Sequence, residues 1–329
     1  MIDVRFGLSA DFRNPPEQAR PSAEVFADII DHLVWAESLG FSHAAFGEHH
    51  FAADGFLPSP LVAATAVAAR TKTMRVATNI AILPFYDPVR LAEDGAVLDV
   101  ISNGRFELGV GLGWAPEEFA GYGIDPKTKR TRADEALQII RGLWRGETMS
   151  VHGTHFQIDG ARITPRPVQD TPPIWVGGPS RFAVRRAAWL GDGYTGPAKK
   201  ETWDLYRAEL AAAGKDPDGA RAIGTGHPWL VVSEDPERTL ARYAPGLLYW
   251  YAHAERTGMW PVPETAEDLV RLRLIQILTP DEAIHTIAAL TAEMPMETFT
   301  LRIAPPGVPA RELTEHLELF ATKVIPHFA

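Results

Sequence analysis

The chain has 329 residues, which is enough for one large domain or two of moderate size. Hydrophobic residues make up 46% and charged residues 22%, the balance of an ordinary globular protein. The net charge of -10 argues against nucleic acid or an anionic membrane as a partner, and the absence of cysteine excludes disulfides, thiolate catalysis and cysteine-ligated metal centres.

Neither a signal peptide nor a membrane span is evident in the sequence. The first residues, MIDVRFGL, lack a basic segment followed by an apolar one. No uncharged apolar run approaches the roughly 20 residues that a transmembrane helix needs. We therefore expect a cytoplasmic protein with no membrane partner.

Strand-like and helix-like segments alternate along the chain. Short apolar segments typical of strands occupy residues 4–8, 43–46, 75–83, 105–111, 173–177, 193–196, 229–233 and 298–303. Helical periodicity is found between them, at residues 23–39, 60–70, 88–101, 131–144, 181–190, 203–213 and 310–324. This alternation predicts an α/β protein with one domain over residues 1–329, a (β/α)8 TIM barrel.

Two segments exceed the length of ordinary barrel connections. Residues 149–164, after the fourth strand, contain the turn signals His152-Gly153 and Asp159-Gly160, which indicate a hairpin. Residues 234–295, after the seventh strand, are far longer than a normal connection and include Tyr249-Trp250-Tyr251. This aromatic insertion is predicted to be an active-site lid, an extra pair of packed helices, or both.

The sequence Gly47-Glu48-His49-His50-Phe51 follows the second predicted strand. Catalytic groups of α/β barrels lie at the C-terminal ends of the strands, and histidine exchanges protons near neutral pH. Neighbouring strand residues point to opposite faces, so His49 and His50 are not expected to hold one metal ion. We predict no metal site. A histidine pair of this kind can be catalytic, or it can be purely structural.

Two glycine-rich turns follow later strands. Gly109, Gly111 and Gly113 end the fourth strand, where the missing side chains allow a flat ring or another strand to approach. Their spacing is not that of a dinucleotide-binding fingerprint. The turn from Gly177 to Ser180 enters a helix N-terminus, which can bind an anion, although Ser180 can equally serve as an ordinary helix cap.

These motifs, taken together and in order, resemble those of the bacterial luciferase-like flavin monooxygenases, most directly the luciferase α subunit. The resemblance covers about residues 4–196 and rests on Glu48-His49-His50-Phe51, Leu83-Pro84, residues 87–94, Ser102-Asn103-Gly104-Arg105-Phe106, residues 132–135, residues 165–169 and the Gly177–Ser180 turn.

The resemblance implies a TIM barrel that binds reduced FMN in its C-terminal mouth. The flavin would react with O2 to give a 4a-hydroperoxide and oxygenate a small apolar substrate, while the protein supplies orientation and proton control. A separate flavin reductase would supply the reduced FMN. The resemblance also implies a homodimer formed through the helices near the start of the barrel, where residues 63–69 are rich in alanine.

The resemblance also implies roles for individual residues. His49 would hold or move the proton, Glu48 would orient the histidine pair or set its protonation, and His50 would have a lesser part. The residues expected at the cofactor are Asn79 and Ile80, joined by a cis peptide behind the flavin ring, Gly111 and Leu112 along it, and Gly178, Pro179 and Ser180 at its phosphate.

This chain departs from the luciferase pattern at Leu112, where a basic residue is expected near the phosphate. Either Arg181 or Arg185 replaces it, or the flavin is bound weakly, as suits a diffusing substrate.

Other functions remain open on the sequence alone. A deazaflavin-dependent dehydrogenase on the same barrel would transfer hydride without oxygen. A non-catalytic flavin-binding or dimerising subunit would use the same fold without His49 chemistry. A metal hydrolase that uses Glu48, His49 and His50 is disfavoured by their alternating directions.

Overall fold

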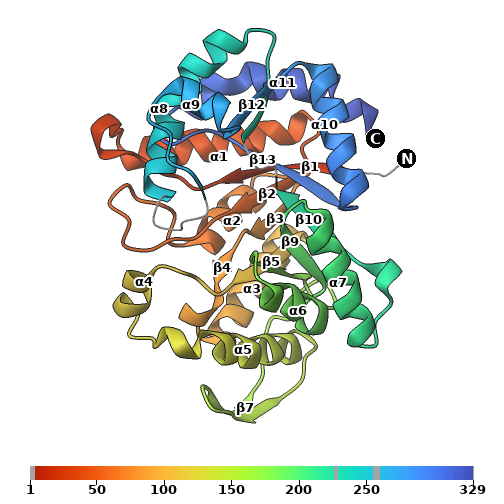
Figure 1. Ribbon diagram of the computed structural model, residues 1–329. Coiled ribbons are helices and arrows are strands. Elements are labelled where there is room, and N and C mark those ends of the chain that lie inside the picture. The colour runs from red at the N-terminus through yellow and green to blue at the C-terminus, as the bar shows by residue number, and fades with distance from the viewer. Residues whose placement is uncertain (1–3, 226–228, 255–259, 329) are drawn as a thin grey trace.

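The structure is a computed structural model that describes residues 4–225, 229–254 and 260–328. Its main feature is a parallel sheet that closes on itself (Figure 1). The strands follow the order β1 (Arg5–Ala10), β2 (His43–Phe46), β3 (Arg75–Thr78), β5 (Phe106–Gly111), β8 (Ile174–Gly177), β9 (Gly193–Pro197), β10 (Ala222–Thr225) and β13 (Thr298–Arg302), and β13 pairs with β1. The predicted TIM barrel is confirmed.

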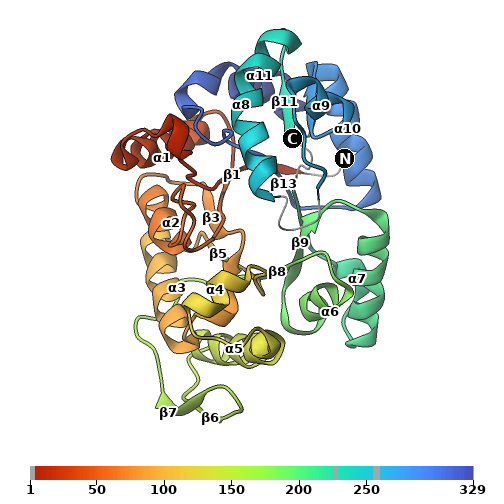
Figure 2. The same cartoon turned by 60° about the vertical axis from the view of Figure 1, so that its left-hand side comes forward.

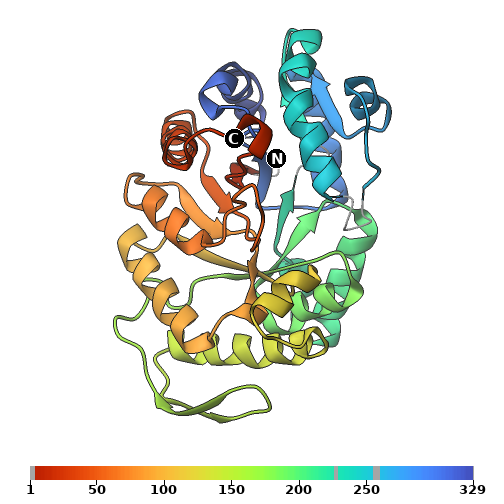
Figure 3. The ribbon, with the colours of Figure 1, turned by 90° about the vertical axis from the view of Figure 1, so that its left-hand side faces the viewer.

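Helices surround this barrel, as Figures 1 and 3 show. They are α1 (Ser22–Ser38), α2 (Pro60–Ala68), α3 (Pro88–Ser102), α5 (Lys129–Trp144), α6 (Arg181–Leu190), α7 (Lys200–Ala212) and α11 (Thr314–Lys323), with the short α4 (Pro116–Gly121) after β5. The amphipathic helices bury one face against the sheet, which produces one large hydrophobic core around the strands.

A short strand, β4 (Ala81–Ile82), continues the line of β3 after an interruption. Val76 of β3 is in register with Phe106 at the start of β5, and Ile82 of β4 with Gly111 at its end. The interruption is the cis peptide Asn79–Ile80, so the cis peptide expected from the family resemblance is confirmed.

The seventh barrel strand is not the one that the sequence predicts. Residues 229–232 form a strand, β11 (Trp229–Val232), but it pairs with β12 (Ile275–Leu278) in a separate two-stranded parallel sheet. The barrel position belongs to β10, between β9 and β13. The insertion after the seventh strand therefore begins before residue 234.

The long insertion forms a compact unit with its own apolar cluster. It contains β11, α8 (Pro236–Ala254), α9 (Ala266–Arg271), β12 and α10 (Pro280–Glu293). Tyr243, Leu247 and Tyr251 of α8 are buried in this cluster against the β11–β12 sheet. Figure 2 shows the teal α8 at the top of the molecule, and Figure 3 shows it in the ring around the strands rather than across them. Tyr249 and Trp250 of α8 reach the cavity described below.

The shorter insertion is the predicted hairpin. It consists of the antiparallel strands β6 (Met149–His152) and β7 (Gln157–Ala161). Figure 1 shows it projecting from the bottom of the molecule, at the end opposite to α8.

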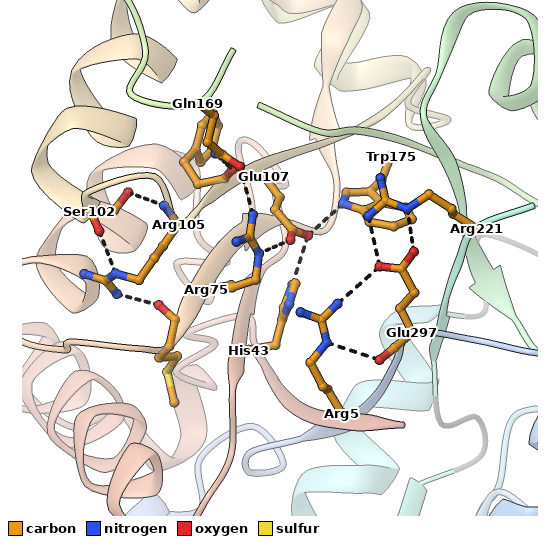
Figure 4. A network of polar contacts seen from close by, with 12 residues as sticks. Arg5, His43, Arg75, Ser102, Arg105, Glu107, Gln169, Trp175, Arg221 and Glu297 are labelled. Carbon is orange, nitrogen blue, oxygen red and sulfur yellow. Dashed lines mark hydrogen bonds and ion pairs between the residues drawn. The ribbon is translucent and has the colours of Figure 1, made fainter. Parts of the chain in front are cut away.

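A polar network lies inside the barrel at the N-terminal ends of the strands (Figure 4). Buried Glu107 accepts a hydrogen bond from Trp175 Nε1 at 2.7 Å and pairs with Arg75, and His43 Nε2 lies 3.8 Å away. Burial opposes ionisation of Glu107, but His43 and Arg75 hold its pKa below the usual range. In TIM barrels this end of the strands serves stability, and catalysis occurs at the other.

Among the described residues, no helix is both long and apolar enough to cross a membrane.

Candidate active site

Glu48, His49 and His50 lie at the C-terminal end of β2, where the loop to α2 begins. Only His49 is partly open to solvent, with 28% of its side chain exposed, whereas the side chains of Glu48 and His50 are 1% and 7% exposed. The two histidines have different partners, as their alternating directions predict.

His49 is held by a carboxylate from α4. Its Nδ1 lies 2.8 Å from Glu118 Oε1, and the same oxygen accepts a hydrogen bond from the backbone N–H of His50 at 2.8 Å. The Glu118 side chain is 1% exposed, and its Oε2 is buried with no hydrogen-bond partner among the described residues. When Glu118 is ionised, the proton of neutral His49 is held on Nδ1, which leaves Nε2 as an acceptor.

His50 belongs to a second, buried network. Its Nε2 lies 2.6 Å from Glu48 Oε1, and its Nδ1 lies 3.1 Å from the Tyr122 hydroxyl. Glu48 Oε2 accepts hydrogen bonds from the Ile82 backbone N–H at 2.8 Å and from Tyr86 Oη at 3.0 Å. Burial, with the neighbouring Glu48, raises the pKa of Tyr86, so Tyr86 stays a donor.

The Glu48 network joins the end of β2 to the backbone of β4. Its contacts with Ile82 fix the strand that follows the Asn79–Ile80 peptide. Glu48 contacts the backbone of β4 and His50 contacts Tyr122, and neither contacts the His49 side chain through a side-chain hydrogen bond.

A cavity of about 410 Å³ opens beside His49. Among the described residues, its wall comes from the loop after β2, the segment from Trp114 to Glu118, and α8, together with Arg13 and Trp260. Most of the large side chains that line it are aromatic: Phe51, Phe56, Trp114, Tyr249, Trp250 and Trp260. A mostly aromatic pocket with a few polar groups is the usual form of a small-molecule site.

The wall farther along the cavity contains a buried ion pair. Arg13 Nε lies 2.6 Å from Asp54 Oδ2, with side chains 7% and 2% exposed. Tyr249 of α8 donates its hydroxyl to the same Asp54 oxygen at 3.0 Å. Although burial works against ionisation, Arg13 and Tyr249 lower the pKa of Asp54, so the carboxylate is charged at neutral pH.

The residues expected at the cofactor lie at the ends of three barrel strands. Asn79 and Ile80 are half-buried after β3, Gly111 ends β5, and Leu112 follows it half-buried. A Cβ on Gly111 would lie 2.1 Å from Ile80 Cδ1, so this glycine makes room for the neighbouring strand. None of the seven expected cofactor residues lines the cavity beside His49.

The turn before α6 is open to solvent. Pro179 and Ser180 are exposed, and Gly178 has a φ of +131°, which favours glycine. Ser180 Oγ caps α6 by accepting from the Ala183 N–H at 3.3 Å. The capping interpretation of Ser180 is thus confirmed, and it leaves the other N–H groups of the first turn available.

Cationic side chains approach this turn in different ways. Arg181 and Arg130 both lie over the ring of Phe182, at 4.9 and 4.2 Å from its centre. Arg185 instead lies 3.8 Å from Glu209, on α7. Near Leu112, Lys129 Nζ donates to the Gly113 carbonyl at 3.0 Å.

Three residues of this site, Glu118, Arg13 and Asp54, are not among those predicted from the sequence. Glu118 had a usable signal, because Pro116-Glu117-Glu118 has the proline and acidic residues of a helix start. Arg13 and Asp54 lie in loops without periodicity, and only the fold brings them together. No group of described residues has the composition and geometry to hold a metal ion.

A histidine paired with a buried carboxylate lies at the C-terminal mouth of this barrel, next to an aromatic cavity, and such an arrangement can exchange a proton with a small organic ligand. The model of the luciferase-like monooxygenases matches residues 4–290, so the chain belongs to this family.

Three relatives illustrate the range of the family. The chain is 33% identical over 231 residues to the F420-dependent glucose-6-phosphate dehydrogenase of Amycolatopsis mediterranei, covering 67% of this chain and 66% of that one. It is 29% identical over 176 residues to the oxygenase component of the flavin-dependent trigonelline monooxygenase of Acinetobacter baylyi, covering 53% and 48%. The chain thus spans about half the length of some curated relatives that it matches.

Among solved structures, the monooxygenase RslO1 from Streptomyces bottropensis superposes with a TM-score of 0.83 at 27% identity. The match covers 99% of this chain and 100% of that one.

Proposed function

We propose that this protein is the oxygenase component of a two-component monooxygenase that uses reduced FMN and O2. The observation that carries the proposal is the His49–Glu118 pair at the wall of an aromatic cavity. A buried carboxylate that holds one histidine nitrogen, with the ring partly open to a cavity, is an arrangement for moving a proton.

The roles of the side chains follow from this geometry. Glu118 keeps the proton of His49 on Nδ1, and His49 Nε2 accepts or returns a proton at the reacting atoms. The aromatic walls exclude water from these atoms. A bound reduced flavin would supply the electrons that activate oxygen, which is chemistry that no side chain can provide.

The residues present fit such a cofactor at its phosphate. The exposed turn at Gly178, Pro179 and Ser180 leaves the N–H groups at the start of α6 open to an anion. We propose that Arg181 and Arg130, which flank Phe182, replace the basic residue missing at Leu112. Arg185 is the weaker candidate, because it faces Glu209.

The sequence similarity to the F420-dependent dehydrogenase supports a second candidate function. In that case a deazaflavin would bind in place of FMN, and hydride would pass between it and the substrate without oxygen. His49 would then exchange the substrate proton. The two functions differ in one measurable respect, the consumption of O2.

The proposal also implies two protein partners. A separate flavin reductase would supply reduced FMN, as the name of the trigonelline enzyme component implies for that relative. A second copy of this chain would cover the outer face of α2 and α3. On this face Val62 is 71% exposed, and Val97, Val100 and Ile101 are 43–44% exposed.

Most of the alanines of α2 do not form the exposed dimer contact that the sequence led us to expect. Ala63, Ala64 and Ala68 are buried against the body of the protein. The proposed dimer therefore rests on the larger exposed side chains of the two helices, and a monomer mass in light scattering would contradict it.

The test is a pair of anaerobic titrations followed by oxygen. Binding of reduced FMN and of reduced F420 to the purified protein is measured by their spectra, and then O2 uptake is recorded with each. The proposal expects saturable binding of reduced FMN and an altered rate of O2 uptake relative to free flavin. Tight F420 binding, with no effect on FMN oxidation, would favour the dehydrogenase instead.

A further inference from the structure

Among the described residues, the cavity beside His49 contains a cation, Arg13, whose hydrogen-bonding capacity is only partly used. Of its five N–H groups, Arg13 directs Nε–H to Asp54 and another to the Tyr249 hydroxyl. Its side chain is 7% exposed and lines the cavity, so part of the guanidinium is reachable from there. A side chain that is almost wholly buried and still has unused donors is prepared for an acceptor from outside.

Arg13 lines this cavity of about 410 Å³ and also a much smaller one of about 20 Å³. The guanidinium carbon lies 5.4 Å from the Phe56 ring centre and 5.1 Å from that of Tyr249. Phe56, Tyr249 and Asp54 all line the cavity. Two aromatic rings and one carboxylate hold the fork in place, which lowers the entropy that a ligand would lose by binding to it.

We infer that the substrate of the proposed enzyme is a planar aromatic compound that carries a carboxylate or similar acidic group, which Arg13 binds. This inference rests on the proposed function for its reaction but not for its binding. A guanidinium fork matches a carboxylate with two parallel hydrogen bonds, and the aromatic walls suit a flat apolar body.

The distribution of charge sets the orientation of such a substrate. Glu118 lines the cavity at the His49 end, where its carboxylate would repel an anion. Arg13 lies on another part of the wall. The Phe56 ring lies close to both Arg13 and His49: its centre is 4.7 Å from the His49 ring centre and 5.4 Å from the Arg13 guanidinium carbon. The acidic group is therefore placed at Arg13 and the reacting end at His49.

The alternative role for Arg13 is purely structural, a link between the loop after β2 and α8. The two roles predict different effects of changes at Asp54. If the pair is only structural, Arg13→Gln and Asp54→Asn both weaken whatever the cavity binds. If Arg13 binds an anion, Asp54→Asn removes a competing negative charge and strengthens anion binding, while Arg13→Gln weakens it.

The test uses calorimetric titration of the cofactor-free protein with two probes of equal shape, 2-naphthoate and 2-naphthamide. The wild type is expected to bind the acid about tenfold more tightly than the amide, the effect of charge-assisted hydrogen bonds. Arg13→Gln should abolish this preference by weakening the acid alone, and Asp54→Asn should increase it. Arg20→Gln, an arginine paired with Asp28 outside this cavity, serves as the control.

Equal binding of the two probes, no binding of either, or an unchanged preference in Arg13→Gln would overturn the inference. If Arg13→Gln does not fold, a preference that falls or stays constant in Asp54→Asn would overturn it as well. Because no flavin is present, failure here leaves the FMN proposal intact. Failure of the FMN titrations would likewise leave an acid-binding cavity.

Discussion

Glu118 Oε1 lies 2.8 Å from His49 Nδ1, although the two residues are 69 positions apart and come from different strand ends. The acid is buried in α4 and the histidine faces the cavity, so the pair joins a protected charge to a reactive surface. Histidines that exchange protons are commonly oriented in this way by a carboxylate on the other ring nitrogen.

Glu118→Ala is expected to impair proton transfer without weakening flavin binding. Loss of a group that orients a functional histidine costs about 10–100-fold. The measurement is the pH profile of O2 uptake with reduced FMN, together with the dissociation constant of FMN. Glu117→Ala removes a charge from the same cavity but keeps the Glu118 bond, so it should change the profile little. Equal profiles for wild type and Glu118→Ala would refute the role of Glu118.

Tyr249→Phe should weaken the attachment of α8 to the loop after β2. It removes the hydrogen bond from α8 to Asp54, which contributes about 1 kcal/mol. Faster amide hydrogen exchange in α8 would report this change. Tyr243→Phe in the same helix is the control, because the Tyr243 hydroxyl is buried with no hydrogen-bond partner among the described residues. Identical exchange in both variants would show that Tyr249 does not hold α8 in place.

Glu107→Gln should destabilise the fold by about 3–5 kcal/mol, because it leaves Arg75 without its buried partner. Urea denaturation measures the loss of unfolding free energy. Glu297→Gln provides a comparison at the same end of the barrel, where the carboxylate is 31% exposed and the cost is about 1 kcal/mol or less. Similar losses for the two variants would contradict the distinction between buried and exposed pairs.

The unfolding free energy should fall as the pH drops from 6.5 to 4. Burial lowers the pKa of His316 to about 4, and its Nδ1 accepts a hydrogen bond from the Val232 N–H at 2.9 Å. The unfolded chain takes up this proton at a higher pH than the folded one, so acid favours unfolding, by up to about 3 kcal/mol. His316→Gln should flatten this part of the stability curve. Some dependence of the unfolding free energy on pH should remain in this variant, because burial also lowers the pKa of His32 to about 4.

The barrel could be predicted from the sequence because seven of its strands are apolar segments of recognisable length. The eighth, β10, could not. Its sequence is Ala222-Ile223-Gly224-Thr225, in which only Ile223 is a large apolar residue typical of strands. The side chain of Met296 fills the space beside Gly224. Trp229–Val232 is a stronger strand by composition, but it pairs with β12 outside the barrel, with Trp229 and Val231 buried in the cluster of the insertion and Leu230 and Val232 in the main core.

The site shows a similar division. His49 follows a clear strand and its direction was predictable from alternation along the chain. Glu118 lies in a helix of six residues, too short for periodicity to reveal. The contact between Asp54 and Tyr249 spans 195 positions, and no local pattern encodes it. The cis peptide at Asn79–Ile80 came from family resemblance, not from the physical properties of its residues.

We propose that His49 controls a proton during the reaction of reduced FMN with oxygen. Stopped-flow mixing of the anaerobic protein and reduced FMN with aerated buffer tests this role in wild type, His49→Ala and His50→Ala. The wild type is expected to delay the return of the oxidised flavin spectrum, and His49→Ala to shorten this delay about 100-fold or more, the lower end of the range for loss of an acid–base group. His50→Ala should have the smaller effect. Reoxidation at the free-flavin rate in the wild type, or an equal delay in wild type and His49→Ala, would contradict it.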